Sequence, residues 1–248
     1  MKISVFVAVI TSLLTGTVVA SAFPVPAPAS MFKKLETGTP QTVVLYGTSL
    51  THGGAWATAT KHWFKQHYPE KVKVINAAGP GQNSDWGLAN LKRNVLTHHP
   101  DLVFIEFSYN DAHEKFKMPV ERGASNLKAI VEALRAENPE VVIVLQTMNV
   151  GWDAPNGKRS FSIRPDLEAF NNNYREFART SGLPLLDHYA TWKKLQDTDR
   201  KTYEAYIPDG THPSDKGSLA VTWPTVKAWL EAARAAVKTP SAASNKTR

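Results

Sequence analysis

Residues 41–53 read Gln-Thr-Val-Val-Leu-Tyr-Gly-Thr-Ser-Leu-Thr-His-Gly. The apolar residues before Gly47 are strand formers, and the Gly, Thr and Ser residues that follow cannot continue a strand, so this stretch predicts a strand that delivers Ser49 at its carboxyl end. Ligands of open α/β sheets bind at the carboxyl ends of strands, which makes Ser49 a candidate nucleophile. The alternative from this stretch alone is that Ser49 and its hydroxyl neighbours only form a turn and cap the next helix.

The rest of the chain repeats a strand followed by a helix. Strands are predicted at 43–46, 72–77, 102–107, 141–146 and 183–186, and helices at 54–68, 84–98, 119–137, 165–180 and 213–237. The third strand is an almost continuous apolar run, as expected of a central parallel strand that is covered on both faces. The alternation predicts an α/β fold, a five-stranded parallel sheet with helices on both faces in a three-layer α/β/α sandwich.

The two ends of the chain differ in composition from its middle. Residues 1–22 have the order of a secretory signal, with a charged start, a hydrophobic run and a small-residue cleavage site, and cleavage is expected after Ala22. An uncleaved anchor helix is the alternative, because the apolar run is just long enough to span a membrane. Residues 23–38 are expected to be a proline-rich, extended leader, 39–238 a single domain and 239–248 a disordered tail.

Composition narrows the function classes. The chain has no cysteine, which excludes disulfides, thiolate metal sites and a cysteine nucleophile. Export without disulfides suits a periplasmic or secreted bacterial enzyme. The net charge of +7 falls to +6 when residues 1–22 are removed, because they contain one lysine and no acid. Since basic residues are spread among acids, a mild attraction for anionic polymers is compatible with the sequence, but nucleic-acid binding is not expected, nor is stable membrane insertion after signal cleavage.

A second polar cluster supplies the partners that a serine nucleophile needs. Serine reacts readily only when a base takes its proton, a third group orients that base, and donors stabilise the oxyanion. Residues 207–214 read Ile-Pro-Asp-Gly-Thr-His-Pro-Ser, with Asp209 and His212 three apart in a loop before the last helix. A structural histidine would have little core to contact in such a loop.

Two other strand ends carry candidate oxyanion donors. Residues 76–84 read Asn-Ala-Ala-Gly-Pro-Gly-Gln-Asn-Ser, in which a glycine allows close approach of a substrate and presents its N–H. Residues 107–111 read Phe-Ser-Tyr-Asn-Asp, and the Asn110 amide can donate to a developing negative oxygen. Each segment is an ordinary turn by itself. Together, four loops at one sheet edge carry a nucleophile, two kinds of donor and an acid–base pair.

With these loops in order, the sequence resembles the SGNH hydrolases, the GDSL-type esterase and lipase family, from about residue 42 to residue 214. The family's first block, Gly-Asp-Ser-Leu, appears at residues 47–50 as Gly-Thr-Ser-Leu, so Thr48 replaces the aspartate. The last block, Asp-x-x-His, is intact at Asp209 and His212. The resemblance implies a flavodoxin-like sheet and a serine ester hydrolase that needs neither a cofactor nor a metal.

The two middle blocks depart further from the family. Its oxyanion glycine follows an asparagine and four further residues, which from Asn76 assigns Gly81, with Gly79 the less favoured choice. Gly-x-Asn-Asp appears here as Ser-Tyr-Asn-Asp, so Asn110 is retained and Ser108 replaces the glycine. A side chain at Ser108 is expected to narrow the substrate pocket.

The resemblance also implies a role for each of these residues. Ser49 attacks an ester carbonyl, His212 acts as general base and then general acid, and Asp209 orients the imidazole and stabilises its charged form. The oxyanion is held by the Ser49 and Gly81 backbone N–H groups and the Asn110 side chain. An acyl-enzyme intermediate follows from these roles.

Other catalytic signatures fit less well. An α/β-hydrolase elbow, Gly-x-Ser-x-Gly, needs glycine where Thr51 stands. A P-loop needs Gly-Lys followed by Ser or Thr, which residues 47–54 lack. The histidines at 62, 67, 98 and 99 lack the i,i+4 spacing and paired carboxylates of a metal site and are expected to be solvated or capping residues. His52 is expected in the pocket wall, without an assigned role.

The loop 148–164 follows the fourth strand and is expected to overhang the site. In it Trp152, Arg159 and Arg164 are candidates to stack on and hydrogen-bond a sugar, with a surface loop of incidental aromatics as the alternative. No long apolar lid of the kind that lipases often have is visible. Export and the polar loop favour a carbohydrate acetylesterase that acts on an acylated small molecule or polysaccharide. A short-chain lipid esterase, lysophospholipase or thioesterase is the alternative, and a non-catalytic glycan-binding protein on the same fold is the hypothesis of a different class.

Overall fold

The computed structural model describes residues 28–155 and 159–238, with a five-stranded sheet at their centre. The strands are β1 (Gln41–Gly47), β2 (Val72–Asn76), β3 (Leu102–Glu106), β4 (Val142–Thr147) and β5 (Leu185–Asp187). Their order is β2-β1-β3-β4-β5, and every neighbouring pair is parallel. This is the flavodoxin-like order, so the predicted sheet is confirmed. Every residue of β3 and β4 is buried, which explains their continuous apolar runs.

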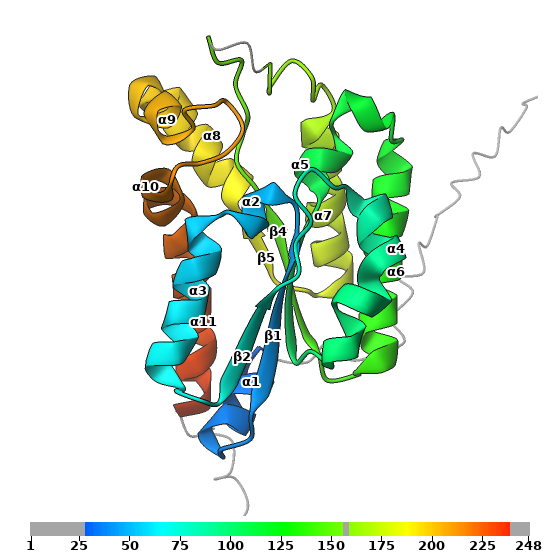
Figure 1. Ribbon diagram of the computed structural model, residues 1–248, viewed down its shortest axis with the longest axis vertical. Coiled ribbons are helices and arrows are strands. Elements are labelled where there is room, and N and C mark those ends of the chain that lie inside the picture. Colours follow the sequence, from blue (N-terminus) through cyan, green and yellow to red (C-terminus); the bar gives the residue numbers. More distant parts are fainter. Residues whose placement is uncertain (1–27, 156–158, 239–248) are drawn as a thin grey trace, which may run out of the picture.

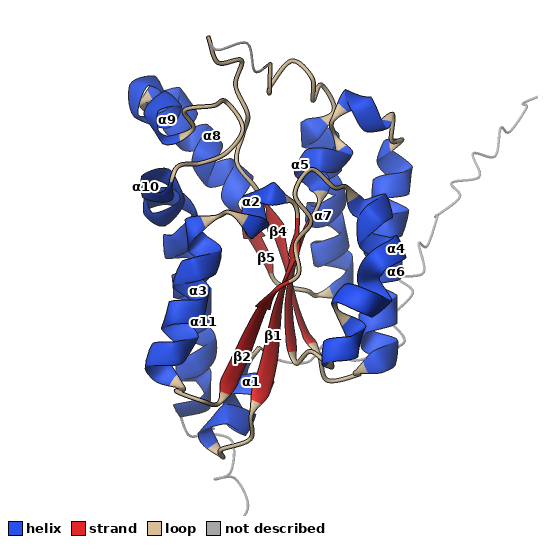
Figure 2. Cartoon of the chain, in the orientation of Figure 1, coloured by secondary structure: helices blue, strands red, loops and turns tan. Residues whose placement is uncertain are grey.

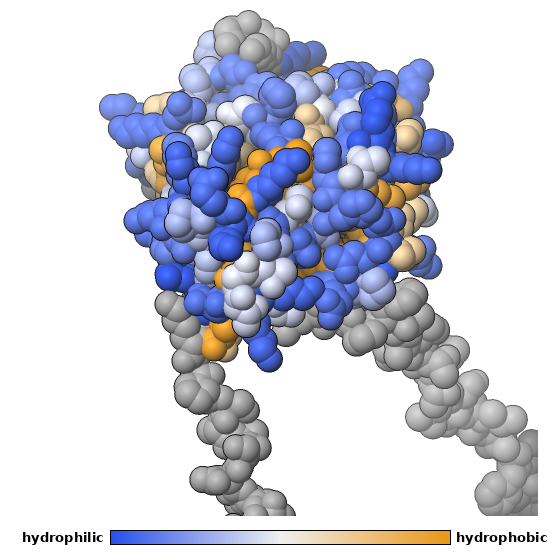
Figure 3. Space-filling view, turned by 60° about the horizontal axis from the view of Figure 1, so that its bottom comes forward, coloured by the Kyte–Doolittle hydropathy of each residue, from blue (hydrophilic) through white to orange (hydrophobic). Residues whose placement is uncertain are grey.

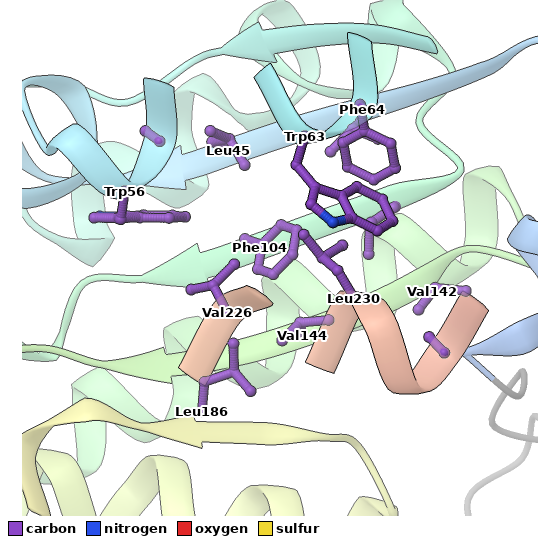
Figure 4. Packing of buried hydrophobic residues seen from close by; sticks show 14 of the residues in the cluster. Leu45, Trp56, Trp63, Phe64, Phe104, Val142, Val144, Leu186, Val226 and Leu230 are labelled. Atoms are coloured by element: carbon purple, nitrogen blue, oxygen red, sulfur yellow. The ribbon is translucent and has the colours of Figure 1, made fainter. Parts of the chain in front are cut away.

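Helices cover both faces of the sheet and make the three layers that the sequence predicted (Figures 1 and 2). One face packs against α1 (Ala29–Glu36), α3 (Ala55–His67) and α11 (Trp223–Lys238). The other packs against α4 (Ser84–Asn94), α6 (Val120–Glu137) and α7 (Leu167–Ser181). On the first face, Trp56 and Phe64 of α3 and Leu230 of α11 surround Phe104 of β3 (Figure 4).

Short helices gather at the carboxyl end of the sheet. They are α2 (Ser49–His52), α5 (Ser108–Asp111), α8 (His188–Thr198), α9 (Arg200–Tyr206) and α10 (Asp215–Gly217), together with the 3₁₀ turn Glu114–Phe116. A second 3₁₀ turn, Leu96–His98, lies between α4 and the start of β3. The sequence did not predict α8 and α9. With Val150, Ile207 and Val221 they form a small separate apolar cluster, in which Trp192 and Tyr203 are completely buried.

The predicted last helix, 213–237, is divided in the structure. Ser214 caps α10, a π turn occupies Ser218–Thr222, and α11 begins at Trp223. Pro224 has no N–H to donate to the carbonyl of residue 220, and a wider turn precedes it. The π turn contributes Ser218 and Thr222 to the cavity described below.

The predicted leader at 23–38 is wrong for the residues of α1. Met31, Phe32 and Leu35 are buried on one face of this helix, and Phe32 lies edge-on to Trp63 of α3 with 6.1 Å between ring centroids. The neighbouring prolines pointed to an extended segment, but Pro28 stands at the N-cap, where it does not interrupt the helix. The domain therefore includes this helix. The predicted signal peptide (1–22) and tail (239–248) lie outside the described residues.

The surface seen in Figure 3 is mostly hydrophilic, with small hydrophobic areas among the charged residues. Within residues 28–155 and 159–238, no helix is both long enough and apolar enough to cross a membrane.

Candidate active site

Ser49 is the first residue of α2 and follows β1 after a single intervening residue. That residue, Thr48, caps the helix, and its hydroxyl accepts a hydrogen bond from the Leu50 N–H at 3.2 Å. At the end of β1, a Cβ on Gly47 would lie 2.3 Å from Glu106 Oε1, so only glycine lets the turn pass over this carboxyl. The capping role that the sequence suggested for this turn is thus filled by Thr48, and the Ser49 hydroxyl is not used for capping.

Ser49, His212 and Asp209 form a continuous chain of hydrogen bonds. Ser49 Oγ lies 2.8 Å from His212 Nε2, and His212 Nδ1 lies 2.8 Å from Asp209 Oδ2. The other Asp209 oxygen accepts from the backbone N–H groups of His212 at 2.7 Å and Thr211 at 2.8 Å. When Nδ1–H donates to Asp209, the Nε2 lone pair faces the serine hydroxyl, which is the arrangement that removes its proton.

Two residues of the loop after β4, Asn149 and Trp152, bond to the segment that carries Asp209 and His212. Trp152 N donates to Gly210 O at 3.0 Å, and its indole Nε1 donates to Ile207 O at 2.7 Å. Asn149 Nδ2 donates to Thr211 O at 2.9 Å. Carbonyl groups on both sides of Asp209 therefore tie its segment to a neighbouring loop, in addition to the contact between Asp209 and His212.

The structure distinguishes the two candidate oxyanion glycines. The N–H of Gly79 donates to Gly47 O at 2.9 Å, and a Cβ there would lie 2.6 Å from the Trp86 ring. Gly81 has a φ of +73°, which side-chain-bearing residues rarely adopt, and no atom lies within 4 Å of a Cβ built on it. Gly79 is committed to packing, whereas Gly81 stands at an open turn. Gly81, the residue chosen from spacing, stays a prediction as the oxyanion donor.

Asn110 comes from α5, directly after β3. Its side chain is 6% exposed, and Nδ2 donates to Gln82 O at 2.7 Å. This bond joins the third sequence block to the loop that carries Gly81. One amide hydrogen is used in this bond, and the second is the one that can serve an oxyanion.

Two buried carboxyl groups lie beneath these loops, and the sequence interpretation missed both. Burial raises the pKa of Glu106 to about 7 and that of Asp111 to about 7. Glu106 accepts hydrogen bonds from the turn of Ser49, and Asp111 Oδ1 accepts from Ser84 N at 2.7 Å. A signal was present for Glu106, because it is the only acid in an otherwise apolar central strand.

Three of the predicted substrate residues point away from the cavity or are committed to the scaffold. Ser108 is 1% exposed and bonds to Asn171 Oδ1 of α7 at 2.8 Å, so it does not narrow the pocket as expected. Arg164 is 6% exposed; its Nε donates to Tyr109 O at 2.9 Å and its Nη1 to Ser160 O at 2.8 Å. Trp152 is half-buried, and its indole N–H is used in the bond to Ile207 O. Of the four, only Arg159 is exposed, and its backbone forms an isolated antiparallel bridge with that of Asp153.

Two neighbouring cavities lie near the carboxyl edge of the sheet, and Ser49 lines the first of them. The first, of about 230 Å³, is mostly apolar and is lined by Ser49, Leu50, His52, Gly53, Gly54, Trp56, Pro80, Met148, His212, Pro213, Ser218 and Thr222. The second, of about 500 Å³, is a more open and polar groove beside the edge strand β2, with Asn76, Gln82, Trp86, Arg93, Asn94 and His98 among its walls. His52 and Pro80 belong to both, so His52 is a wall residue as predicted.

The histidines outside the loop of His212 do not form a metal-binding cluster in the part of the chain that the structure describes. There, no group of three or more His, Asp or Glu side chains is arranged to hold an ion. His67 instead bonds to Trp63 O at 2.8 Å, and His99 Nδ1 lies 2.8 Å from Glu137.

The sheet order and the placement of the Ser, Gly, Asn and His blocks at its carboxyl edge define an SGNH hydrolase. The sequence profile of the GDSL-like Lipase/Acylhydrolase family matches residues 45–220. The chain belongs to this family and is an ester hydrolase.

Individual relatives are distant but cover most of the chain. The human isoamyl acetate-hydrolyzing esterase 1 homolog is 25% identical over 75% of this chain and 81% of its own. The thioesterase 1/protease 1/lysophospholipase L1 of Escherichia coli is 27% identical over 70% and 76%.

Solved structures share the fold. A lipase/acylhydrolase from Enterococcus faecalis superposes with a TM-score of 0.62 at 24% identity, covering 76% of this chain and 95% of that one. An acetylxylan esterase from Geobacillus stearothermophilus gives a TM-score of 0.63 at 17% identity, covering 77% and 94%.

Proposed function

We propose that this protein hydrolyses carboxylic esters through an acyl-enzyme on Ser49. The observation that carries the proposal is the unbroken chain from Ser49 Oγ through His212 to Asp209, with 2.8 Å at each step. A protein that only binds glycans on this fold has no need of these three side chains in this order. The non-catalytic alternative is therefore disfavoured.

In the first half-reaction, Ser49 Oγ attacks the ester carbonyl carbon while His212 Nε2 takes its proton. The negative oxygen that forms is stabilised by the N–H groups of Ser49 and Gly81 and by the Asn110 amide. The carbon–oxygen bond to the alcohol then breaks as His212 returns the proton to the leaving oxygen. Water repeats the sequence on the acyl-enzyme, again giving its proton to His212, and the acid leaves with Ser49 restored.

We propose an acetylated carbohydrate as the substrate class. The polar groove beside β2 offers hydrogen-bonding side chains such as Gln82 and Asn94 together with the half-buried Trp86, a combination suited to sugars. The fold is shared with an acetylxylan esterase. The groove also replaces the loop after β4 as the surface on which a sugar would lie, because Trp152 and Arg164 of that loop are bonded to the backbone of the scaffold.

A second candidate, a small ester with an apolar alkyl or acyl group, is favoured by the first cavity. Leu50, Trp56 and Met148 line it directly beside Ser49, and apolar walls suit an alkyl group. The named relatives include an esterase of isoamyl acetate and a thioesterase/lysophospholipase.

One assay separates these candidates. Acetate release from acetylxylan is measured beside hydrolysis of p-nitrophenyl esters from two to eight carbons, with wild type, Ser49→Ala and, as a matched control, the exposed Ser125→Ala. Loss of activity only in Ser49→Ala is expected. Equal activity of Ser49→Ala and wild type would show that Ser49 is not the nucleophile. Preference for the longer acyl chains, with no acetate from acetylxylan, would replace the carbohydrate by the alkyl ester.

We further propose that the enzyme is exported, on the basis of the signal-like order of residues 1–22. Amino-terminal sequencing of the protein recovered outside the cytoplasm should begin at Phe23. A product that retains Met1 and fractionates with membranes would favour the anchor.

A further inference from the structure

Glu106 lies directly beneath the turn that carries Ser49. It is the last residue of β3 and is completely buried. Its Oε1 accepts hydrogen bonds from Thr48 N at 2.6 Å, from Thr48 Oγ1 at 3.0 Å and from Thr51 Oγ1 at 2.7 Å. One carboxyl oxygen therefore gathers three donors from the two residues that flank Ser49 and Leu50.

These bonds constrain α2 at both ends. Thr48 precedes Ser49 and uses its hydroxyl twice, accepting from Leu50 N and donating to Glu106. Thr51 lies two residues after Ser49 on the same short helix. A helix of one turn has little stability of its own. Its orientation, and with it the direction of Ser49 Oγ, depends on the groups that bind it from below.

Packing does not account for an acid at this position. The four residues before it in β3, 102–105, are apolar and buried, and an aliphatic side chain would continue that layer. Burial and the nearby Asp111 both act to raise the pKa of Glu106, so its ionised form is costly to the folded state. Groups that are retained at such cost occur preferentially at functional sites.

We propose that Glu106 is a positioning residue for Ser49: by holding Thr48 and Thr51, it keeps the serine hydroxyl within hydrogen-bonding distance of His212. The inference rests on the proposed role of Ser49 as the nucleophile. Glu106 itself contacts neither the substrate nor the reacting atoms. Its effect therefore belongs in kcat and in the reactivity of Ser49, with little effect on KM.

Glu106→Gln tests this with almost no change of shape. Glutamine keeps one acceptor oxygen but places an NH₂ donor where the second carboxyl oxygen was, so the three donors are no longer all satisfied by a charged acceptor. We expect kcat for p-nitrophenyl acetate to fall by about ten- to a hundredfold at unchanged KM, since a misplacement of about 1 Å can cost about 10²-fold. Labelling of Ser49 by a fluorophosphonate should slow in parallel.

The pH profile of kcat is a readout that a purely structural role would not move, whereas thermal unfolding would reveal a structural role. Glu106 accepts all three bonds best when ionised, so its protonation should steepen the acid side of the wild-type kcat profile, and Glu106→Gln should lack this second ionisation. Asp111 from α5 and Tyr174 from α7 act on Glu106 electrostatically and are present in both proteins. Because the pKa of Glu106 is raised in the folded state, its charge at pH 8 destabilises the fold. Glu106→Gln should therefore have an unchanged or higher melting temperature at pH 8.

Thr51 supplies an independent pair of variants. Thr51→Ser keeps the hydroxyl that donates to Glu106 and should retain most of kcat, whereas Thr51→Val removes it and should lose about as much as Glu106→Gln. If Glu106→Gln does not fold, this pair still decides.

The outcomes separate the inference from the function on which it rests. An active wild type, an inactive Ser49→Ala and a fully active Glu106→Gln would overturn the positioning role alone, as would equal kcat in Thr51→Val and Thr51→Ser. An active Ser49→Ala would overturn the proposed function itself. Loss of kcat in Glu106→Gln and Thr51→Val, with unfolding at pH 8 preserved in Glu106→Gln, would support the role.

Discussion

Replacement of Asn110 by alanine tests the proposed oxyanion site most directly. In the free enzyme, Asn110 Nδ2 uses one hydrogen for Gln82 O at 2.7 Å, which leaves the second for the developing negative oxygen. Loss of one such donor in serine hydrolases costs about 10²–10³-fold in kcat, or about 2.7–4 kcal/mol of transition-state stabilisation. The lost bond to Gln82 O should lower the free energy of unfolding by about 1 kcal/mol, a separate and much smaller effect.

A matched control separates the two effects. Asn173 of α7 also donates from Nδ2 to one backbone carbonyl, Val120 O, at 2.8 Å. Asn173→Ala should therefore cost a similar amount of stability, while kcat stays within about twofold of wild type. Both variants are measured with saturating p-nitrophenyl acetate and by urea unfolding. An Asn110→Ala enzyme that keeps wild-type kcat would show that Asn110 is no oxyanion donor, and equal kcat losses in the two variants would assign the effect to folding.

Three further predictions concern packing and pH. Gly47→Ala should abolish or strongly reduce soluble, active enzyme, because its Cβ would lie 2.3 Å from Glu106 Oε1; near-normal kcat and melting temperature would contradict the close packing. Trp152→Phe should lose about 1 kcal/mol of stability with the bond to Ile207 O but keep its KM for acetylxylan within about twofold, whereas a tenfold rise in KM would restore this residue as a sugar contact. Burial lowers the pKa of His188 from 6.5 to about 4, so as the pH falls the unfolded chain binds this proton before the folded protein does. Between pH 6.5 and pH 4, the free energy of unfolding of wild type should therefore fall by about 3 kcal/mol more than that of His188→Gln. Parallel plots of unfolding free energy against pH for the two proteins, from urea titrations, would refute this.

The sheet was predictable because its signals are local. Each apolar run had to end where a Gly, Ser or Asn cluster began, and the parallel order followed from alternation with helices. The helix α1 was missed because Pro28 and its neighbours suggested an extended chain, while the burial of Phe32 depends on Trp63 and Phe64, which are distant in sequence.

Within the site, residue type and spacing were enough to predict the residues with a characteristic side-chain chemistry. Ser49, Asp209 and His212 needed only a shared sheet edge to meet. The roles of Arg164 and Ser108 could not be obtained in this way, because a polar side chain in a loop is equally able to face solvent or to satisfy buried groups. The structure settles their orientation by the partners that each one meets, Tyr109 O and Asn171.

The two departures from the family motif consequently have different meanings from those that the sequence suggested. Thr48 stands where the family has aspartate, and its hydroxyl joins the helix of Ser49 to the buried Glu106. Ser108 bonds into α7 and leaves the pocket unchanged. Neither substitution can select a substrate by contact. Selection must come from the walls that meet a ligand, and these change from apolar to polar across His52 and Pro80, the residues that both cavities share. An ester whose two halves differ in polarity would match this division, because one half can lie against the apolar wall while the other lies along the polar groove.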